Sequence, residues 1–141
     1  MPGLSETFPL VMTQDVIWRD MDAFQHVNNA VYFRYFEDIR MKFFEETGIV
    51  RLMNETQLGP ILGSTRCDFR SPLEFPDRIQ VATAIEDIKA RRFSMKYVVW
   101  SEGQDRIAAE GEGLLVYYDY AAGRSCEIPA QVRQAIEKLT I

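Results

Sequence analysis

The 141-residue sequence contains one histidine and two cysteines, and this scarcity excludes several kinds of site. Cys67 and Cys126 lie far apart in the chain and match neither a disulfide framework nor the spacing of a metal-binding motif. We therefore expect both thiols to be reduced and no metal to be bound.

Positive charge and long apolar runs are also scarce. The formal net charge is −5, and binding to nucleic acid or to an anionic membrane needs a positive surface field. No stretch approaches the roughly 18 apolar residues that cross a bilayer, and no basic, apolar leader opens the chain. We expect a cytoplasmic protein that binds neither nucleic acid nor membrane.

The composition is that of a folded protein, with 47% apolar and 12% aromatic residues in 141 positions. A chain of this length fits one domain with a real hydrophobic core. We therefore treat residues 1–141 as a single domain.

A long helix is predicted over residues 30–47. Asn28 or Asn29 can cap its first turn, and Gly48 is a natural stop. Apolar residues cover more of this helix than one narrow stripe, which indicates that it is largely buried. Glu37 is expected to pair with Arg40 three positions later.

The rest of the chain alternates apolar and polar residues with the period of β-strands. Gly111 and Gly113 lie two positions apart, so they share one face and leave room for the helix. The predicted fold is α+β, an antiparallel sheet wrapped around one long central helix, and residual apolar surface favours a symmetric oligomer. The predicted strands cover residues 10–19, 61–69, 79–86, 93–100 and 107–118, and a short helix covers 129–139.

A polar motif lies between the first strand and the long helix. Residues 18–29 contain two aspartates, the only histidine and two asparagines. Groups that can move protons or donate hydrogen bonds therefore lie at a helix N-terminus, where the free N–H groups favour negative charge.

This motif resembles that of hotdog-fold acyl-CoA thioesterases of the 4-hydroxybenzoyl-CoA thioesterase type. The matching segments are Asp20–Asn29 with Tyr32, then Asp68–Asp77, then the basic turn Lys89–Arg92. Three matches in the same order cover nearly the whole chain.

The resemblance implies a role for each matched position. Asp22 is implied to be the catalytic carboxylate, either a nucleophile that forms a mixed anhydride or a general base for water. The first helix amides, near Asn29, are implied to polarise the thioester carbonyl. Lys89, Arg91 and Arg92 are implied to meet the phosphates of coenzyme A (CoA), which is part of the substrate, and no separate cofactor is needed.

The residue types also allow plainer roles. Asp20 is read as a structural hydrogen-bonding residue, and His26 as a packing residue, an orienting residue or a proton shuttle. Tyr32 fits core packing or substrate contact, and a basic hairpin turn can serve solubility alone.

One position departs from the family pattern, because many relatives have glycine where this chain has Gln25. The surrounding residues 25–29 also resemble the motif of long-chain acyl thioesterases. The predicted activity is hydrolysis of acyl-CoA thioesters by a homodimer or homotetramer. The alternatives are an acyl-carrier-protein thioesterase, a hydroxyacyl-thioester dehydratase, and a non-catalytic acyl-CoA-binding module.

Overall fold

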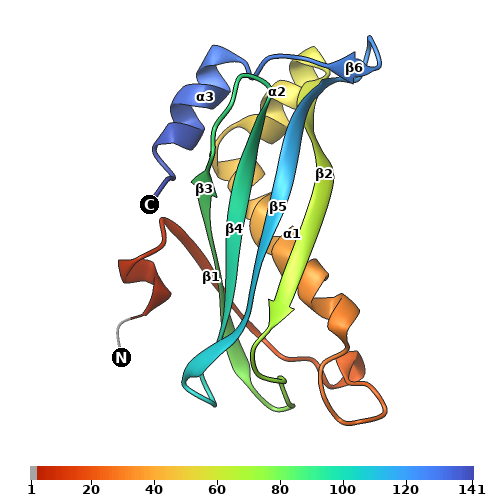
Figure 1. The fold of residues 1–141 in the computed structure, drawn as a ribbon, viewed down its shortest axis with the longest axis vertical. Helices are drawn as coiled ribbons and strands as arrows, with labels where there is room; N and C mark the ends of the chain where they lie inside the picture. Colours follow the sequence, from red (N-terminus) through yellow and green to blue (C-terminus); the bar gives the residue numbers. More distant parts are fainter. Residues whose placement is uncertain (1–2) are drawn as a thin grey trace.

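The computed structural model describes residues 3–141 as a curled sheet with one long helix against its concave face (Figure 1). Two 3₁₀ turns, at Leu4–Glu6 and Trp18–Asp20, flank the first strand. The helices are α1 (Asn29–Glu46), α2 (Ile49–Thr56) and α3 (Ala130–Glu137). The strands are β1 (Leu10–Asp15), β2 (Leu58–Phe69), β3 (Arg78–Glu86), β4 (Arg92–Ser101), β5 (Arg106–Asp119) and β6 (Arg124–Ser125).

The sheet has the strand order β1-β3-β4-β5-β2, and all neighbouring strands are antiparallel. The short β6 pairs with the end of β5. Strand β2 follows α2 in the chain but crosses to the far side of β5, so it forms one edge of the sheet. This is the predicted α+β arrangement of an antiparallel sheet around a central helix.

Helix α1 packs closely on the sheet at Gly111 of β5. A Cβ placed on Gly111 would lie 2.5 Å from both the Phe36 ring and the Arg66 carbonyl oxygen. Phe36 in turn stacks on Tyr97 of β4, with ring centroids 4.6 Å apart. The prediction that the two glycines make room for the helix is therefore confirmed for Gly111 but not for Gly113, where a Cβ would first meet Tyr97 of β4, at 2.9 Å from its hydroxyl oxygen.

Several local predictions differ from the structure. Strand β1 ends at Asp15, and the chain then turns through Trp18–Asp20 instead of staying extended to residue 19. Helix α2 was not predicted; it begins directly after Gly48, whose φ of +79° redirects the chain. Strand β2 begins three residues earlier than predicted, at Leu58.

The expected ion pair between Glu37 and Arg40 is absent among residues 3–141. Arg40 is only 8% exposed and its Nη1 donates to the Tyr97 hydroxyl across 3.0 Å, whereas Glu37 is exposed. The prediction was wrong because Arg40 turns toward the sheet and away from the solvent-facing side of α1.

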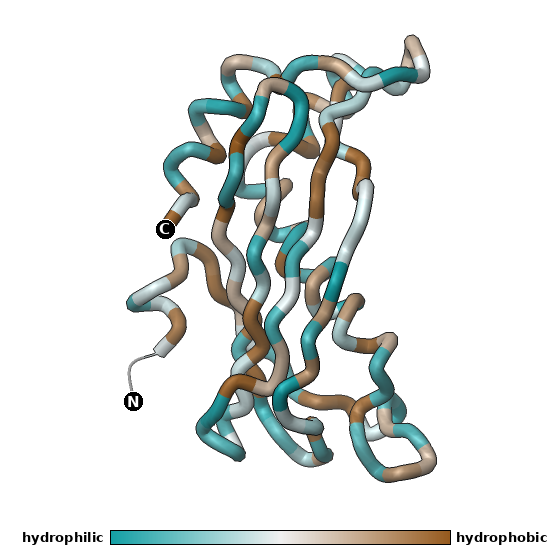
Figure 2. The backbone as a smooth tube through the Cα atoms, viewed as in Figure 1, coloured by the Kyte–Doolittle hydropathy of each residue, from teal (hydrophilic) through white to brown (hydrophobic). Residues whose placement is uncertain are grey.

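Hydrophilic residues are concentrated in the turns at both ends of the sheet (Figure 2). Two buried clusters hold the fold: a large one between α1 and the sheet, and a small one around Phe8, Ala82 and Val98. Within residues 3–141, no helix is both long and apolar enough to cross a membrane.

Candidate active site

Asp22 lies in a tight loop that its own carboxylate stabilises. Oδ1 accepts hydrogen bonds from the N–H groups of Phe24 (2.8 Å) and His26 (3.3 Å). The Asp22 N–H donates to the His26 carbonyl across 2.8 Å, and a bridge between Met21 and Val27 closes the loop. One carboxylate oxygen is thus held by the backbone, and within residues 3–141 no hydrogen bond engages Oδ2.

The long helix begins directly after this loop. The Asn28 side chain accepts from the Ala30 N–H across 3.0 Å, which confirms Asn28 as the N-cap. The Val31 N–H donates to the Asn28 carbonyl across 2.9 Å. Among the described residues nothing accepts from the Asn29 N–H, so the first amide of α1 keeps a free donor with the partial positive charge of a helix N-terminus.

Asp22 and Asn29 open on one hollow, which we call the Asn29 hollow. Its volume is about 560 Å³. Its walls come from the loop of residues 21–27, which we call the motif loop, from the start of α1, and from the end of β2 with the chain just after it. Four of the predicted site residues therefore meet here. The lining residues are Asp22, Phe24, His26, Val27, Asn29, Tyr32, Phe69, Arg70, Ser71 and Pro72.

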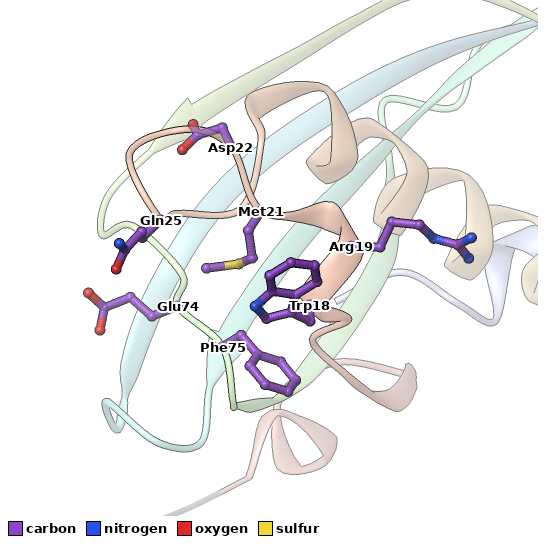
Figure 3. A pocket seen from close by; sticks show the side chains of 7 residues that line it. All are labelled: Trp18, Arg19, Met21, Asp22, Gln25, Glu74 and Phe75. Carbon is purple, nitrogen blue, oxygen red and sulfur yellow. The ribbon is translucent and has the colours of Figure 1, made fainter.

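Asp22 also borders a second hollow, the Trp18 hollow, with a volume of about 580 Å³. Trp18 is 72% exposed, and Figure 3 shows its indole close to Phe75, with the Met21 side chain pointing toward the same space. Glu74 lies at the rim of this hollow. A surface with several large apolar side chains thus lies beside Asp22, in addition to the Asn29 hollow.

His26 faces the segment that follows β2. Its Nε2 lies 3.8 Å from Oε1 of Glu74, and the two side chains are 41% and 70% exposed. This separation is longer than a hydrogen bond, so the pair is a weak, solvated contact that depends on protonation of the imidazole. His26 is close enough to Asp22 to share its hollow but is not hydrogen-bonded to its carboxylate through the ring.

Asp20 and Tyr32 hold the walls of the site together. The carboxylate of Asp20 binds the guanidinium of Arg34 on α1, and this hydrogen bond raises the pKa of Arg34. The Tyr32 hydroxyl accepts from the Leu73 N–H across 3.3 Å, and burial raises the pKa of Tyr32, so the phenol is neutral near pH 7. Asp20 therefore makes the hydrogen bond expected of a structural residue.

The basic turn lies at the other end of the sheet. The chain from Lys89 to Arg92 joins β3 to β4 at the end away from Asp22 (Figure 1). Nine residues of β3 separate the two ends, a distance of about 30 Å. Arg91 donates there to the Ser125 carbonyl across 3.1 Å. Within one chain, Lys89, Arg91 and Arg92 are therefore not brought together with Asp22.

No role was predicted for residues 69–72, at the end of β2 and directly after it, although they belong to the second matching segment, Asp68–Asp77. Phe69 and Arg70 line the Asn29 hollow, and Arg70 is held by Glu110, with Nε 3.1 Å from Oε2. Phe24, which is 82% exposed, was also missed. Within residues 3–141 no group of three or more His, Cys, Asp or Glu side chains is arranged to hold a metal.

A family model described as the Thioesterase-like superfamily matches residues 16–136. The chain belongs to this superfamily. The match includes the motif loop, α1 and all of the sheet except β1, so the predicted family resemblance is confirmed.

Individual relatives agree with this assignment. A putative esterase of Aquifex aeolicus (strain VF5) is 25% identical over 130 residues, which are 92% of this chain and 98% of that protein. The long-chain acyl-CoA thioesterase FadM of Escherichia coli (strain K12) is 18% identical over 119 residues, 84% and 90% of the two chains. A thioesterase from Thermus thermophilus, solved with coenzyme A and Zn, is 28% identical, with a TM-score of 0.83 and coverage of 95% and 96%. The chain is thus a hotdog-fold thioester hydrolase.

Proposed function

We propose that the protein hydrolyses acyl-CoA thioesters to a free carboxylic acid and CoA, with Asp22 as the reacting carboxylate. One observation carries the proposal: Asp22 and Asn29, whose backbone N–H has no acceptor among the described residues, line the same hollow. Thioester hydrolysis needs both a base or nucleophile and a donor for the negative charge that develops on the carbonyl oxygen.

The Asn29 N–H supplies that donor. It is a backbone group fixed by the Asn28 cap, and the helix dipole adds to its partial positive charge. A donor that is already oriented stabilises a growing oxyanion without rearrangement during the reaction. No separate cofactor is part of the proposal, because CoA enters as part of the substrate.

Asp22 can act in two ways. As a general base, it takes a proton from water while the water oxygen bonds to the carbonyl carbon, and the C–S bond then breaks to release CoA. As a nucleophile, its oxygen bonds to the carbonyl carbon and displaces CoA thiolate, and water then hydrolyses the mixed anhydride. Both routes suit a carboxylate held by one oxygen with the other free.

His26 is proposed as an orienting residue or proton shuttle, since it lies in the same hollow and close to Glu74. Tyr32 contributes the wall of the hollow. Its buried hydroxyl already accepts a hydrogen bond from the Leu73 N–H, which favours a packing role over direct contact with the substrate.

The CoA end of the substrate is anionic and needs basic residues. Lys89, Arg91 and Arg92 are proposed to meet its phosphates, but they lie about 30 Å along the sheet from Asp22 of the same chain. A second copy in antiparallel orientation would bring its own basic turn toward this end of the sheet. We therefore propose that the working form is a homodimer or homotetramer. As a separate point, we propose that the protein is cytoplasmic. The Thermus thermophilus relative, solved with coenzyme A, supports the choice of CoA.

A thiol-release assay across aromatic, short, medium and long acyl-CoAs tests the proposal, with the free acid identified by mass spectrometry. We expect Asp22→Asn to lower kcat about 10²- to 10⁴-fold, because asparagine can still accept the two loop hydrogen bonds but cannot take a proton. Asp68→Asn, the same change at a carboxylate on β2 outside both hollows, should keep wild-type activity. Full activity in Asp22→Asn would contradict this mechanism.

Three other functions give different results in the same assay. An acyl-carrier-protein thioesterase would release the same acid faster from acylated carrier than from acyl-CoA. A dehydratase, which the shared hollow of Asp22 and His26 permits, would form an enoyl product with the thioester intact. A non-catalytic binding module would bind acyl-CoA without turnover.

A further inference from the structure

The side chain of Gln104, in the turn between β4 and β5, binds two consecutive residues of the chain after β2. Its Nε2 donates to the Pro72 carbonyl across 2.8 Å, and its Oε1 accepts from the Ser71 hydroxyl across 2.5 Å. Proline has no N–H, and among residues 3–141 the Pro72 carbonyl accepts no other hydrogen bond. Within the described chain, Pro72 is therefore hydrogen-bonded through Gln104 alone.

Ser71 and Pro72 form part of the wall of the Asn29 hollow. They lie in no helix or strand, so contacts with other elements decide their position. The residues on either side of the Pro72 carbonyl have anchors of their own. The Ser71 N–H donates to the Ala108 carbonyl across 3.0 Å, and the Leu73 N–H donates to the Tyr32 hydroxyl. The part of the wall between these two anchors depends on Gln104.

The turn that carries Gln104 is fixed to the far end of the same segment. The Gln104 N–H donates to the Ser101 hydroxyl across 3.0 Å, and that hydroxyl donates to Oδ2 of Asp77 across 2.5 Å. Oδ1 of Asp77 accepts from the Gly103 N–H across 2.8 Å. Because Ser101 is fully buried, water does not compete for its hydrogen bonds. The turn thus holds the Gln104 amide in one place against the wall.

We propose that Gln104 is a positioning residue of the active site, which fixes the Ser71–Pro72 wall so that a bound thioester lies correctly for reaction at Asp22. Gln104 does not line the hollow itself, so it acts through these two residues. The inference rests on the proposed function, because it takes the Asn29 hollow as the place where the thioester binds.

The cost of a loose wall falls on the chemical step. A displacement of a bound substrate by about 1 Å can lower the rate about 10²-fold. Ser71 is only 7% exposed, so loss of the Gln104 amide would leave its hydroxyl without an acceptor in a nearly buried place. The wall would then shift or become mobile while most contacts that hold the substrate remain.

Steady-state thiol release with one acyl-CoA tests this role in two variants of Gln104. Gln104→Ala removes both contacts, whereas Gln104→Glu keeps an acceptor for Ser71 and removes the donor to Pro72. We expect both variants to lower kcat roughly ten- to hundredfold, with KM changed less than about twofold. Gln104 is exposed, and circular dichroism establishes that each variant is folded at the assay temperature.

Glu102→Ala is the matched control in the same turn. Glu102 is also exposed, but its carboxylate accepts from Gln80 of β3 across 3.3 Å and does not contact the wall. This variant should keep the wild-type kcat. Wild-type kcat in both Gln104 variants, or an equal fall in Glu102→Ala, would overturn the proposal.

Hydrogen–deuterium exchange of the peptide covering residues 69–75 examines the wall without substrate. Exchange should be at least about threefold faster in Gln104→Ala than in the wild type and unchanged in Glu102→Ala. Unchanged exchange in Gln104→Ala would overturn the proposal, whatever the kinetics. If the wild type releases no thiol, the proposed function fails, and faster exchange in Gln104→Ala still supports Gln104 as the residue that holds the wall.

Discussion

The hydroxyl of Tyr32 accepts a hydrogen bond from the backbone N–H of Leu73 across 3.3 Å, which joins α1 to the segment that closes the site. The carbonyl of the same leucine accepts from the Val27 N–H across 2.9 Å. The motif loop, the helix and the chain after β2 are therefore held together at one point. Because Tyr32 and Leu73 are 2% and 0% exposed, water cannot easily replace this hydrogen bond.

Tyr32→Phe removes the acceptor and leaves a buried N–H unsatisfied. We expect the free energy of unfolding to fall by about 1–3 kcal/mol, measured by urea denaturation. Tyr120→Phe is the matched control, since its hydroxyl donates to the Pro60 carbonyl across 3.0 Å in an exposed position. An equal fall in the free energy of unfolding in the two variants would show that burial does not increase the contribution of the Tyr32–Leu73 hydrogen bond to stability.

Gly111→Ala should be strongly destabilising. The added Cβ would meet the Phe36 ring and the Arg66 carbonyl oxygen at 2.5 Å, so the helix or β2 must move. We expect a loss of about 3 kcal/mol in thermal or urea unfolding. Gly63→Ala, whose Cβ would lie 3.4 Å from its nearest neighbour on Val116, should change stability by about 1 kcal/mol or less.

The elements of this fold could be predicted from the sequence because their signals are local. The cap at Asn28 and the alternation along β3, β4 and β5 depend only on nearby residues. The pairing of β2 with β5 could not be predicted in this way, since it joins segments that are far apart in the sequence. Helix α2 was missed because it is short and depends on the turn at Gly48.

The same limit applies to the site. The placement of Asp22, His26 and Asn29 in one hollow follows from a short loop, and it was predictable. Phe69 and Arg70 reach that hollow only because β2 forms the sheet edge next to α1, which is a long-range property. The basic turn gave a clear local signal, but its distance from Asp22 depends on the strand order.

The backbone conformation at Gln25 explains why glycine suits this position of the motif. Its φ is +64°, a left-handed conformation that favours glycine. Gln25→Gly relieves a cost of about 1–2 kcal/mol but adds about 0.5–1 kcal/mol of unfolded-state entropy. We expect a net gain of about 0.5–1 kcal/mol in unfolding free energy. Ala23→Gly, at a residue in the same loop without positive φ, should only destabilise. A loss of stability in both variants would contradict the argument.

Cys67 supplies a pH-dependent prediction. Burial, with a smaller contribution from the neighbouring Asp68, raises the pKa of its thiol from 9.0 to about 11. The thiolate is the reactive form, so alkylation of Cys67 by iodoacetamide should be slow at about pH 8 and rise with a midpoint near pH 11. In urea-unfolded protein the midpoint should lie near 9.0.

The same shift in pKa links the thiol to stability. Because the folded state favours the neutral thiol, its contribution to stability is complete below about pH 9 and is lost as the pH rises through about 11.

The alkylation rate is followed by mass spectrometry of the Cys67 peptide, with circular dichroism to establish the pH range in which the chain stays folded. Rapid alkylation of folded protein at about pH 8, at the rate of the unfolded chain, would show that the thiol is not shielded by its surroundings.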